Sequence, residues 1–281
     1  MIYCNGEFIE DSTPCISVQD RGFLYGDGLF ETMRILNGSP VFWKNHFSRF
    51  AKGAETLSIS LPHSEISLHS LSKNLIEMNS LKQGLLRIQL SRGSGKRGYS
   101  TANVKSATLL ISTHSLPGTI GIPNKGWALK TSSYRIDETD PLNQVKTCSK
   151  LKTIMAMAEA EQGGFDDALM INTKGEVVES TRANLFWMLD GAIHTAPINS
   201  GALPGITRSK VIDLCNKEGS SVVETRIQPD DLLKAEGVFA TVSTYGLVDI
   251  IGLDGQEIPK SPTTTRLSKL YQILLHSTGS L

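Results

Sequence analysis

The sequence predicts an α/β (α+β) protein with two domains. Short apolar runs bounded by Gly, Asn, Asp and Pro are typical of strands, and they occur between segments whose apolar residues have helical spacing. A length of 281 residues is enough for two hydrophobic cores. Residues 116–124 are rich in proline and glycine and lie between two strand patterns, which predicts a linker. We therefore expect a small N-terminal α/β domain over 1–115 and a larger domain over 125–281.

Strands and helices alternate in the N-terminal part. An Asn-Gly pair between apolar runs is a strong hairpin signal, and it occurs twice here. Two segments have apolar residues at helical spacing, and aliphatic runs predict the strands around them. The expected elements are a hairpin around 5–6, a strand over 29–36 that turns back at 37–38, helices over 44–57 and 64–78, and strands over 85–90 and 107–113.

The C-terminal part shows the same alternation. A helix pattern follows Lys146. Its apolar stripe is interpreted as core, because a stripe containing methionine is more often core than a cofactor contact; it consists of Leu151, Ile154, Met155, Met157 and Ala158. Aliphatic runs separated by turn residues predict the strands. The other expected elements are strands over 127–131, 168–171, 177–178, 184–187 and 238–244, a helix that begins near 206, and a last helix over 263–275.

Composition argues against several classes of function. The 28 basic and 28 acidic residues give a formal net charge of +0, so no general attraction to nucleic acid or to an anionic membrane is expected. No apolar run is long enough to span a bilayer, and the first ten residues read as strand–turn–strand and not as a signal peptide. The four cysteines and six histidines lack metal-ligand spacing. We expect reduced thiols, no metal and a cytoplasmic protein.

The stretch from Lys146 to Arg208 has three features that together suit an aromatic aldehyde carrying a phosphate. Lys146 offers an amine that can bond covalently to the aldehyde. Glu179 offers a carboxylate that can keep a ring nitrogen protonated. A Gly-Ile-Thr helix start offers backbone N–H groups for the phosphate. Each feature alone is usually structural, since most lysines are surface charges, so the prediction rests on the three occurring in this order.

This stretch resembles the core of the class IV pyridoxal-phosphate enzymes (fold type IV). That family includes branched-chain and D-amino acid aminotransferases and 4-amino-4-deoxychorismate lyase. The run D-R-G-F-L-Y-G-D-G-L-F-E resembles the N-terminal signature of the same family, so the resemblance covers nearly the whole chain. It implies a two-domain fold similar to D-amino acid aminotransferase, pyridoxal 5'-phosphate as cofactor, and a homodimer whose sites lie near the subunit interface.

The resemblance also implies roles for single residues. Lys146 corresponds to the lysine that holds the cofactor, whereas its competitors Lys150 and Lys152 are interpreted as solvated positions in the following helix. Arg49, in an H-x-x-R pattern, matches an arginine that reaches the phosphate, and a guanidinium fork suits that contact. The other implied cofactor contacts are Glu179 at the ring nitrogen, Leu203 behind the ring, and Ile206, Thr207 and either Ser243 or Thr244 at the phosphate.

The glycine-rich loop over 91–100 bears on the substrate. Most such loops are solvated surface loops. Here the run S-R-G-S-G-K-R-G-Y-S resembles the aminodeoxychorismate lyase version of the loop, whereas D-aminotransferases of the family tend to carry Arg-x-His at this place. Arg97 and Tyr99 are therefore the expected contacts for substrate carboxylates, from the same or the partner subunit. Leu151 stands where branched-chain aminotransferases usually have a tyrosine, which disfavours that branch.

The resulting hypothesis is a lyase that converts 4-amino-4-deoxychorismate to 4-aminobenzoate and pyruvate, with Lys146 as general base. One alternative is an aminotransferase of the same fold, acting on D-amino acids or branched-chain amino acids, which needs a 2-oxo acid as second substrate. Another alternative, of a different class, is a non-catalytic binding protein that kept the fold. The presence of both Lys146 and Glu179 disfavours this last alternative.

Overall fold

The computed structural model describes residues 1–102, 104, 106–116 and 125–278. The chain separates into two compact units, and each is described by itself. The first comprises Met1–Pro117, Val145–Lys150 and Leu275–Leu281, and the second comprises Gly118–Gln144 and Leu151–Leu274. The short segment 145–150 thus belongs to the first unit, although it lies far along the chain. Apart from Leu116, the linker expected at 116–124 lies outside the described residues.

The first unit is built on a six-stranded antiparallel sheet with the strand order β2-β1-β6-β5-β3-β4. Asn5 and Asn37 have positive φ (49° and 51°) in the two Asn-Gly turns, and both predicted hairpins are confirmed. The elements of this unit are β1 (Ile2–Cys4), β2 (Glu7–Ile9), α1 (Arg21–Tyr25), β3 (Gly28–Leu36), β4 (Ser39–Pro40), α2 (Trp43–Thr56), α3 (Glu65–Met78), β5 (Gln83–Ser91) and β6 (Thr108–His114).

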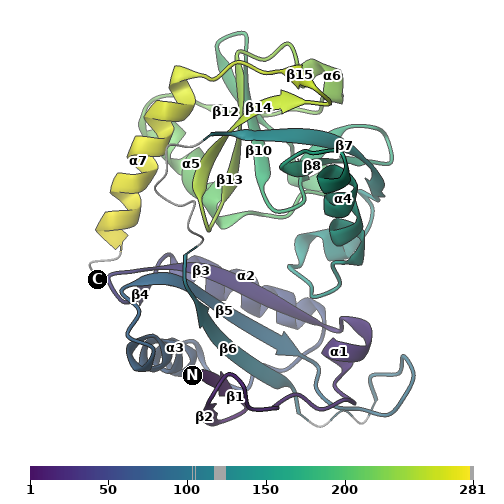
Figure 1. The fold of residues 1–281 in the computed structure, drawn as a ribbon, viewed down its shortest axis with the longest axis vertical. Helices are drawn as coiled ribbons and strands as arrows, with labels where there is room; N and C mark the ends of the chain where they lie inside the picture. Colours follow the sequence, from purple (N-terminus) through teal and green to yellow (C-terminus); the bar gives the residue numbers. More distant parts are fainter. Residues whose placement is uncertain (103, 105, 117–124, 279–281) are drawn as a thin grey trace. The chain divides into compact units, whose positions relative to one another are not determined.

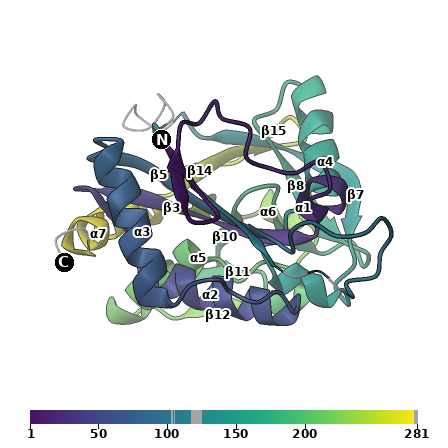
Figure 2. The same ribbon diagram turned by 90° about the horizontal axis from the view of Figure 1, so that it is seen from below.

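Alternation along β3 separates a buried face of this sheet from a half-open face. Leu29, Met33 and Ile35 pack into one core with residues of β5, β6, α2 and α3. Figures 1 and 2 show α2 alongside β3, and α3 lies across the sheet, in contact with β1, β6 and β4. Phe30 and Thr32, which alternate with these residues along the strand, are only half-buried. Polar side chains can therefore be placed on this second face.

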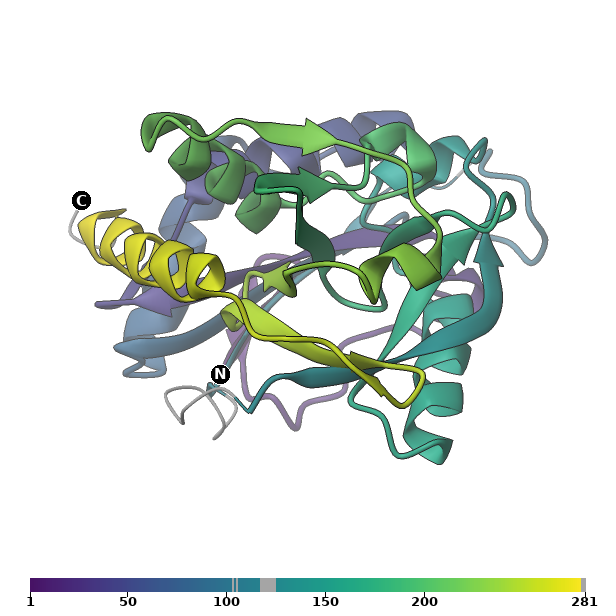
Figure 3. The ribbon, with the colours of Figure 1, turned by 90° about the horizontal axis from the view of Figure 1, so that it is seen from above.

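The second unit is built on a ring of six strands (Figure 3). The strands pair in the order β10-β13-β14-β7-β8-β9, and β9 pairs again with β10, which closes the ring. Its apolar core includes Leu129, Leu185, Trp187 and Ile250. The strands are β7 (Trp127–Ile136), β8 (Asp167–Asn172), β9 (Val177–Ser180), β10 (Asn184–Leu189), β11 (Ala192–Thr195), β12 (Val222–Glu224), β13 (Gly237–Val242), β14 (Gly246–Leu253) and β15 (Gln256–Glu257). The helices are α4 (Leu151–Gln162), α5 (Ile206–Lys217), α6 (Pro229–Leu232) and α7 (Pro262–Thr278), with 3-10 turns at Pro141–Gln144 and Ile198–Ser200.

Helix α4 shows that one prediction is wrong. Of the five residues expected to be core, Leu151, Ile154 and Met155 are 71%, 60% and 41% exposed, whereas Met157 and Ala158 are half-buried. The buried residues of the helix are instead Ala156 and Ala160, one turn apart, which pack against side chains of β8. Small side chains let the helix approach the strands closely, so the alanine face becomes the core face. The larger apolar residues are left on the outside.

The ends of β7 and β13 also differ from the predicted ones. β7 continues to Ile136, because the polar residues Ser132 and Ser133 that hide the strand pattern are bonded to the Glu159 carboxylate of α4. β13 ends at Val242, so Ser243 lies in the turn before β14 and not in a strand. In the described part of the chain no helix combines the length and apolar character needed to cross a bilayer. All four cysteines are free thiols.

Candidate functional site

Lys146 lies in the segment 145–150, which runs beside the start of β3. The backbone N–H of Phe30 donates to the carbonyl oxygen of Lys146 (3.0 Å), and the N–H of Cys148 donates to the carbonyl of Gly28 (2.8 Å). The lysine side chain is half-buried, and its Nζ lies 4.7 Å from the centroid of the Phe30 ring. A cation in this position is attracted to the ring face. Hydrogen bonds therefore fix the backbone of this segment, and the amine of Lys146 lies over the Phe30 ring.

A second cation lies over the same ring. The Cζ atom of Arg87, on β5, is 3.9 Å from the Phe30 centroid, and Lys146 Nζ is 4.7 Å from the same centroid. Both cations therefore contact one aromatic ring. Burial lowers the pKa of Arg87. Its guanidinium donates to the neutral Gln89 Oε1 (3.2 and 3.3 Å), and it has no acidic partner among the described residues. A half-buried guanidinium without a carboxylate is well placed to bind an anion.

Arg49 belongs to a buried ion network on the helix-covered side of the same strand. The Glu31 carboxylate accepts from Arg49 Nε and Nη2, both at 2.7 Å, and from His46 Nδ1, also at 2.7 Å. Burial alone would raise the pKa of Glu31, but the His46 and Arg49 donors outweigh it and lower the pKa to about 2. Burial lowers the pKa of His46 against the opposing effect of Glu31, and the cations Arg49 and Lys146 add to the lowering. Glu31 therefore fixes the orientation of Arg49, and Lys146 lies near this network.

Glu179, in β9 of the second unit, is held by two hydrogen bonds. Its Oε2 accepts from Asn184 Nδ2 (3.0 Å) and from the backbone N–H of Leu203 (3.1 Å). Asn184 lies opposite Glu179 where β9 pairs with β10, and its amide also donates to the Leu203 carbonyl (2.9 Å). These contacts orient the carboxylate and bring Leu203 next to it.

The start of α5 adjoins this group. Its N-cap residue is Gly205, which supplies no side-chain acceptor for the first N–H groups of the helix. A Cβ atom on Gly205 would lie 1.9 Å from Asn184 Oδ1, so only glycine lets the helix begin so close to Asn184. Ile206 and Thr207 form the first turn and are buried. An uncapped helix start of this kind is a typical binding site for a phosphate.

The turn that contains Ser243 and Thr244 lies near this helix start. Thr241, at the end of β13, pairs with Asn184. Tyr271 of α7 places its hydroxyl 3.4 Å from Thr207 Oγ1, and its ring lies 3.2 Å from where a Cβ of Gly246 would be. Asn184 and Tyr271 therefore connect the two sides of this turn with α5. The sequence predicted the last helix, but sequence reasoning did not identify Tyr271.

Arg97 and Tyr99 lie on the outside of the loop between β5 and β6. Arg97 is exposed, and the side chain of Tyr99 is 87% exposed and packs edge-on against Tyr25, with 5.7 Å between the ring centroids. The loop therefore presents a cation and a phenol to its surroundings.

The predicted residues thus fall into three sets. Lys146 and Arg49 lie in the first unit together with the newly identified Arg87. The substrate-loop set consists of Arg97 and Tyr99. The set in the second unit consists of Glu179, Leu203, Ile206, Thr207 and Ser243. Between them these sets supply an amine, a fixed carboxylate, an uncapped helix start and several guanidinium groups, which can bond an aldehyde, hold a proton on a ring nitrogen, and bind phosphate and carboxylate groups.

The chain is similar to known proteins over most of its length. Residues 28–252 match the family model described as amino-transferase class IV. A candidate branched-chain-amino-acid aminotransferase of Methanocaldococcus jannaschii is 32% identical over 258 residues, covering 92% of this chain and 89% of that protein. The D-alanine aminotransferase of Bacillus licheniformis is 31% identical, with 90% and 88% covered. The aminodeoxychorismate lyase of Vibrio harveyi is 30% identical, with 86% and 89% covered.

Solved structures show the same similarity. A candidate 4-amino-4-deoxychorismate lyase from Legionella pneumophila superposes with a TM-score of 0.88 at 30% identity, covering 94% of this chain and 97% of that one. A T.th. branched-chain amino acid aminotransferase, solved with pyridoxamine 5'-phosphate, superposes with a TM-score of 0.91 at 26% identity, covering 98% and 94%. The predicted fold type is thereby confirmed. The similar proteins do not share one activity.

Proposed function

The chain belongs to the amino-transferase class IV family, and from that premise we propose that it is a lyase that converts 4-amino-4-deoxychorismate to 4-aminobenzoate and pyruvate. Enzymes of this family depend on pyridoxal 5'-phosphate, which supplies an electron-withdrawing ring when bound. The residues present fit that group. Glycine is required at position 205 for α5 to start beside Asn184, and this leaves the helix start without a capping side chain. The cofactor's phosphate has the charge that such a start binds.

We assign the cofactor contacts as follows. Lys146 Nζ would bond to the aldehyde, and Glu179 would hold the proton on the ring nitrogen, because its carboxylate is already oriented by two donors. Leu203 would pack against the ring. The phosphate would be bound by Ile206 and Thr207 at the start of α5, by Ser243 in the adjoining turn, and by Arg49.

Lys146 would have a second task when the substrate is bound. Its Nζ can take the proton from the substrate carbon that bears nitrogen. The bond from the neighbouring ring carbon to the enol oxygen can then break, the ring becomes aromatic, and Lys146 can return the proton to the methylene carbon of the released enol, which gives pyruvate. The amine is half-buried over Phe30, where few waters compete for the proton.

The observation that favours a lyase is Arg87, the half-buried guanidinium beside Phe30 that lacks an acidic partner in the described part of the chain. The substrate of the lyase carries two carboxylates, whereas D-alanine carries one. Arg87 would bind one of them and Arg97 the other, with Tyr99 as a hydroxyl donor. The alternative activity is that of an aminotransferase, and the relatives with 31–32% identity are the observation that favours it.

An assay without any 2-oxo acid separates the two activities. We expect the purified protein to form 4-aminobenzoate and pyruvate in equal amounts from 4-amino-4-deoxychorismate alone. An aminotransferase would stop after one turnover per site, since its cofactor needs an oxo acid to be regenerated. If no 4-aminobenzoate accumulates, while D-alanine and 2-oxoglutarate are turned over rapidly, the lyase proposal is wrong.

The same assay tests the assignment of Arg87. Arg87→Gln should raise KM by roughly 10- to 100-fold, the range given by a charge-assisted hydrogen bond of about 1.5–3 kcal/mol, with a smaller change in kcat. Arg34→Gln is the matched control. Arg34 lies on the same face of β3 as Phe30, but it is further from the segment that carries Lys146. A KM unchanged by the Arg87 substitution would remove this residue from the substrate site.

We also infer that the protein is a homodimer. Apolar side chains are exposed on the outer side of α4, at Leu151 and Ile154, and around α1, at Phe23 and Tyr99. Exposed apolar groups of this kind are typical of surfaces that are covered in an assembly. Light scattering after size-exclusion chromatography should give twice the chain mass of 30.6 kDa, and a monomer at micromolar concentration would contradict the inference. The four free thiols also fit a cytoplasmic location.

A further inference from the structure

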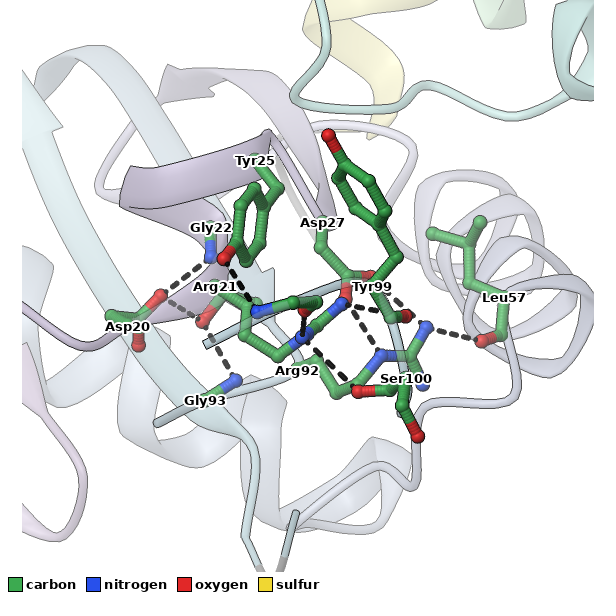
Figure 4. Close-up of polar contacts among 12 residues, drawn as sticks. Asp20, Arg21, Gly22, Tyr25, Asp27, Leu57, Arg92, Gly93, Tyr99 and Ser100 are labelled. Carbon is green, nitrogen blue, oxygen red and sulfur yellow. Dashed lines mark hydrogen bonds and ion pairs between the residues drawn. The ribbon is translucent and has the colours of Figure 1, made fainter. Parts of the chain in front are cut away.

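Arg21, the first residue of α1, is buried beneath the loop that follows β5 (Figure 4). Its Nη1 donates to the carbonyl oxygens of Gly98 (2.8 Å) and Ser100 (3.2 Å), and its Nη2 donates to that of Tyr99 (3.3 Å). Its Nε donates to Asp27 Oδ2 (2.7 Å). One guanidinium therefore binds three consecutive main-chain carbonyls of the loop and one carboxylate.

These bonds determine which way the loop side chains point. Because the carbonyls of residues 98–100 are directed inward to Arg21, the backbone must turn around the guanidinium. Gly98 has a φ of 112°, which a side chain would strain, and its N–H donates to the Tyr25 hydroxyl (3.1 Å). The side chains of Arg97 and Tyr99 are left exposed. Figure 4 shows the Tyr99 ring directed away from the Arg21 guanidinium.

Asp27 connects this arrangement with the end of α2. It accepts from Arg21 and also from Arg92 Nε and Nη2 (2.8 and 2.9 Å), while Arg92 donates to the carbonyls of Leu57 and Ser58 after α2 (2.8 and 3.0 Å). Burial would raise the pKa of Asp27, but the two arginines outweigh it and lower the pKa. The ionised carboxylate thus compensates two largely buried cations and ties the loop to α2.

We propose that Arg21 is a positioning residue for substrate recognition, holding the 97–100 turn so that Arg97 and Tyr99 are oriented before the substrate binds. This inference rests on the proposed function, since the substrate contact of Arg97 comes from it. Arg21 is 3% exposed and acts through the loop. A loop without this support must be ordered during binding, and the entropic cost of that ordering weakens binding rather than the chemical step.

Arg21→Lys tests the proposal with little change in charge. Lysine can still pair with Asp27, but a single ammonium cannot span three carbonyls as the guanidinium fork does. KM should rise about tenfold while kcat stays within about threefold of the wild type. The matched control is Arg92→Lys, which loosens the same Asp27 pair without touching residues 98–100 and should leave KM near the wild-type value. Equal KM values for the two variants would overturn the proposal.

A double-mutant cycle shows whether Arg21 acts through Arg97. Arg97→Gln should raise KM, and adding Arg21→Lys to it should raise KM little further, because both changes remove the same contact. If the KM of the double variant rises by the product of the two single fold-changes, the two residues act independently and the proposal is overturned. Tyr25→Phe, which removes only the bond to the Gly98 N–H, is the milder variant if Arg21→Lys does not fold.

Hydrogen exchange of the loop provides a readout that is independent of the lyase reaction. The peptide spanning residues 97–101 should exchange faster in Arg21→Lys, or in Tyr25→Phe, than in the wild type or in Arg92→Lys. If the wild type does not cleave 4-amino-4-deoxychorismate, the proposed function fails, while exchange and the KM of the aminotransferase reaction still decide the role of Arg21. Loop exchange at the wild-type rate in the Arg21 and Tyr25 variants would refute that role.

Discussion

Lys146→Ala is expected to lower kcat by roughly 10⁴-fold or more, because one side chain supplies both the covalent attachment of the cofactor and the general base. The fold should survive the change. The segment around Lys146 is held by backbone hydrogen bonds to Gly28 and Phe30, and these do not involve the lysine side chain. Steady-state kinetics measure the loss, and circular dichroism checks that the variant is folded.

The two competing lysines provide the controls. Lys150 lies at the end of the same segment, and Lys152 in the first turn of α4 donates to the Arg135 carbonyl (2.9 Å) from an exposed position. Lys150→Ala and Lys152→Ala should each keep kcat within about threefold of the wild type, as surface substitutions usually do. An active Lys146→Ala enzyme beside an inactive Lys150→Ala enzyme would transfer the role to Lys150.

Glu179→Gln should lower kcat by about 10²- to 10³-fold, the range seen when one pre-oriented electrostatic group is removed from a reaction centre. The substitution keeps the size of the side chain, and a glutamine oxygen can still accept from the Leu203 N–H and from Asn184. What disappears is the negative charge that would keep the ring nitrogen protonated. The loss should therefore appear in kcat, with the cofactor still bound.

Glu176→Gln is the matched control for that experiment. Glu176 lies in the same hairpin as Glu179, and its carboxylate pairs with Arg226 and accepts from Asn172. Removing its charge should cost some stability but leave kcat within about threefold, since such surface pairs contribute about 0–1 kcal/mol. If Glu179→Gln is as active as Glu176→Gln, the carboxylate of Glu179 has no role in the reaction.

The order of the motifs predicted most of the candidate cofactor residues, but not the partners that orient them. Glu31 illustrates the difference. Glu31 lies on the same face of β3 as Leu29 and Met33, so a charged residue at this position should be buried and paired with an opposite charge. The partners of Glu31, Arg49 and His46, lie on α2, and no local pattern says that this helix covers that point of the strand.

The place of Lys146 could not be predicted for a related reason. Local spacing predicted a helix after it, and α4 is present. The pairing of residues 146–148 with residues 28–30 joins parts of the chain more than a hundred residues apart, and it depends on the whole first unit. Arg87 was overlooked because a single arginine in an aliphatic strand is usually a solvated edge residue, and its position over Phe30 appears only in three dimensions.

Helix α4 shows a further limit of periodicity. The spacing of the apolar residues predicts a core face, but three of them, Leu151, Ile154 and Met155, lie on the outside. A stripe that faces a second subunit has the same spacing as one that faces a core, and the alanines that do pack inward give a weaker signal. The sequence pattern shows that α4 has an apolar face, but only the packing shows which face of the helix is buried within the chain.

Borohydride reduction of the purified protein, followed by peptide mapping, tests the central claim most directly. The protein should be yellow as purified, and reduction should fix one phosphopyridoxyl group per chain on the peptide that contains Lys146. A label on any other lysine, or a colourless protein that gains no label after incubation with pyridoxal 5'-phosphate, would contradict the account.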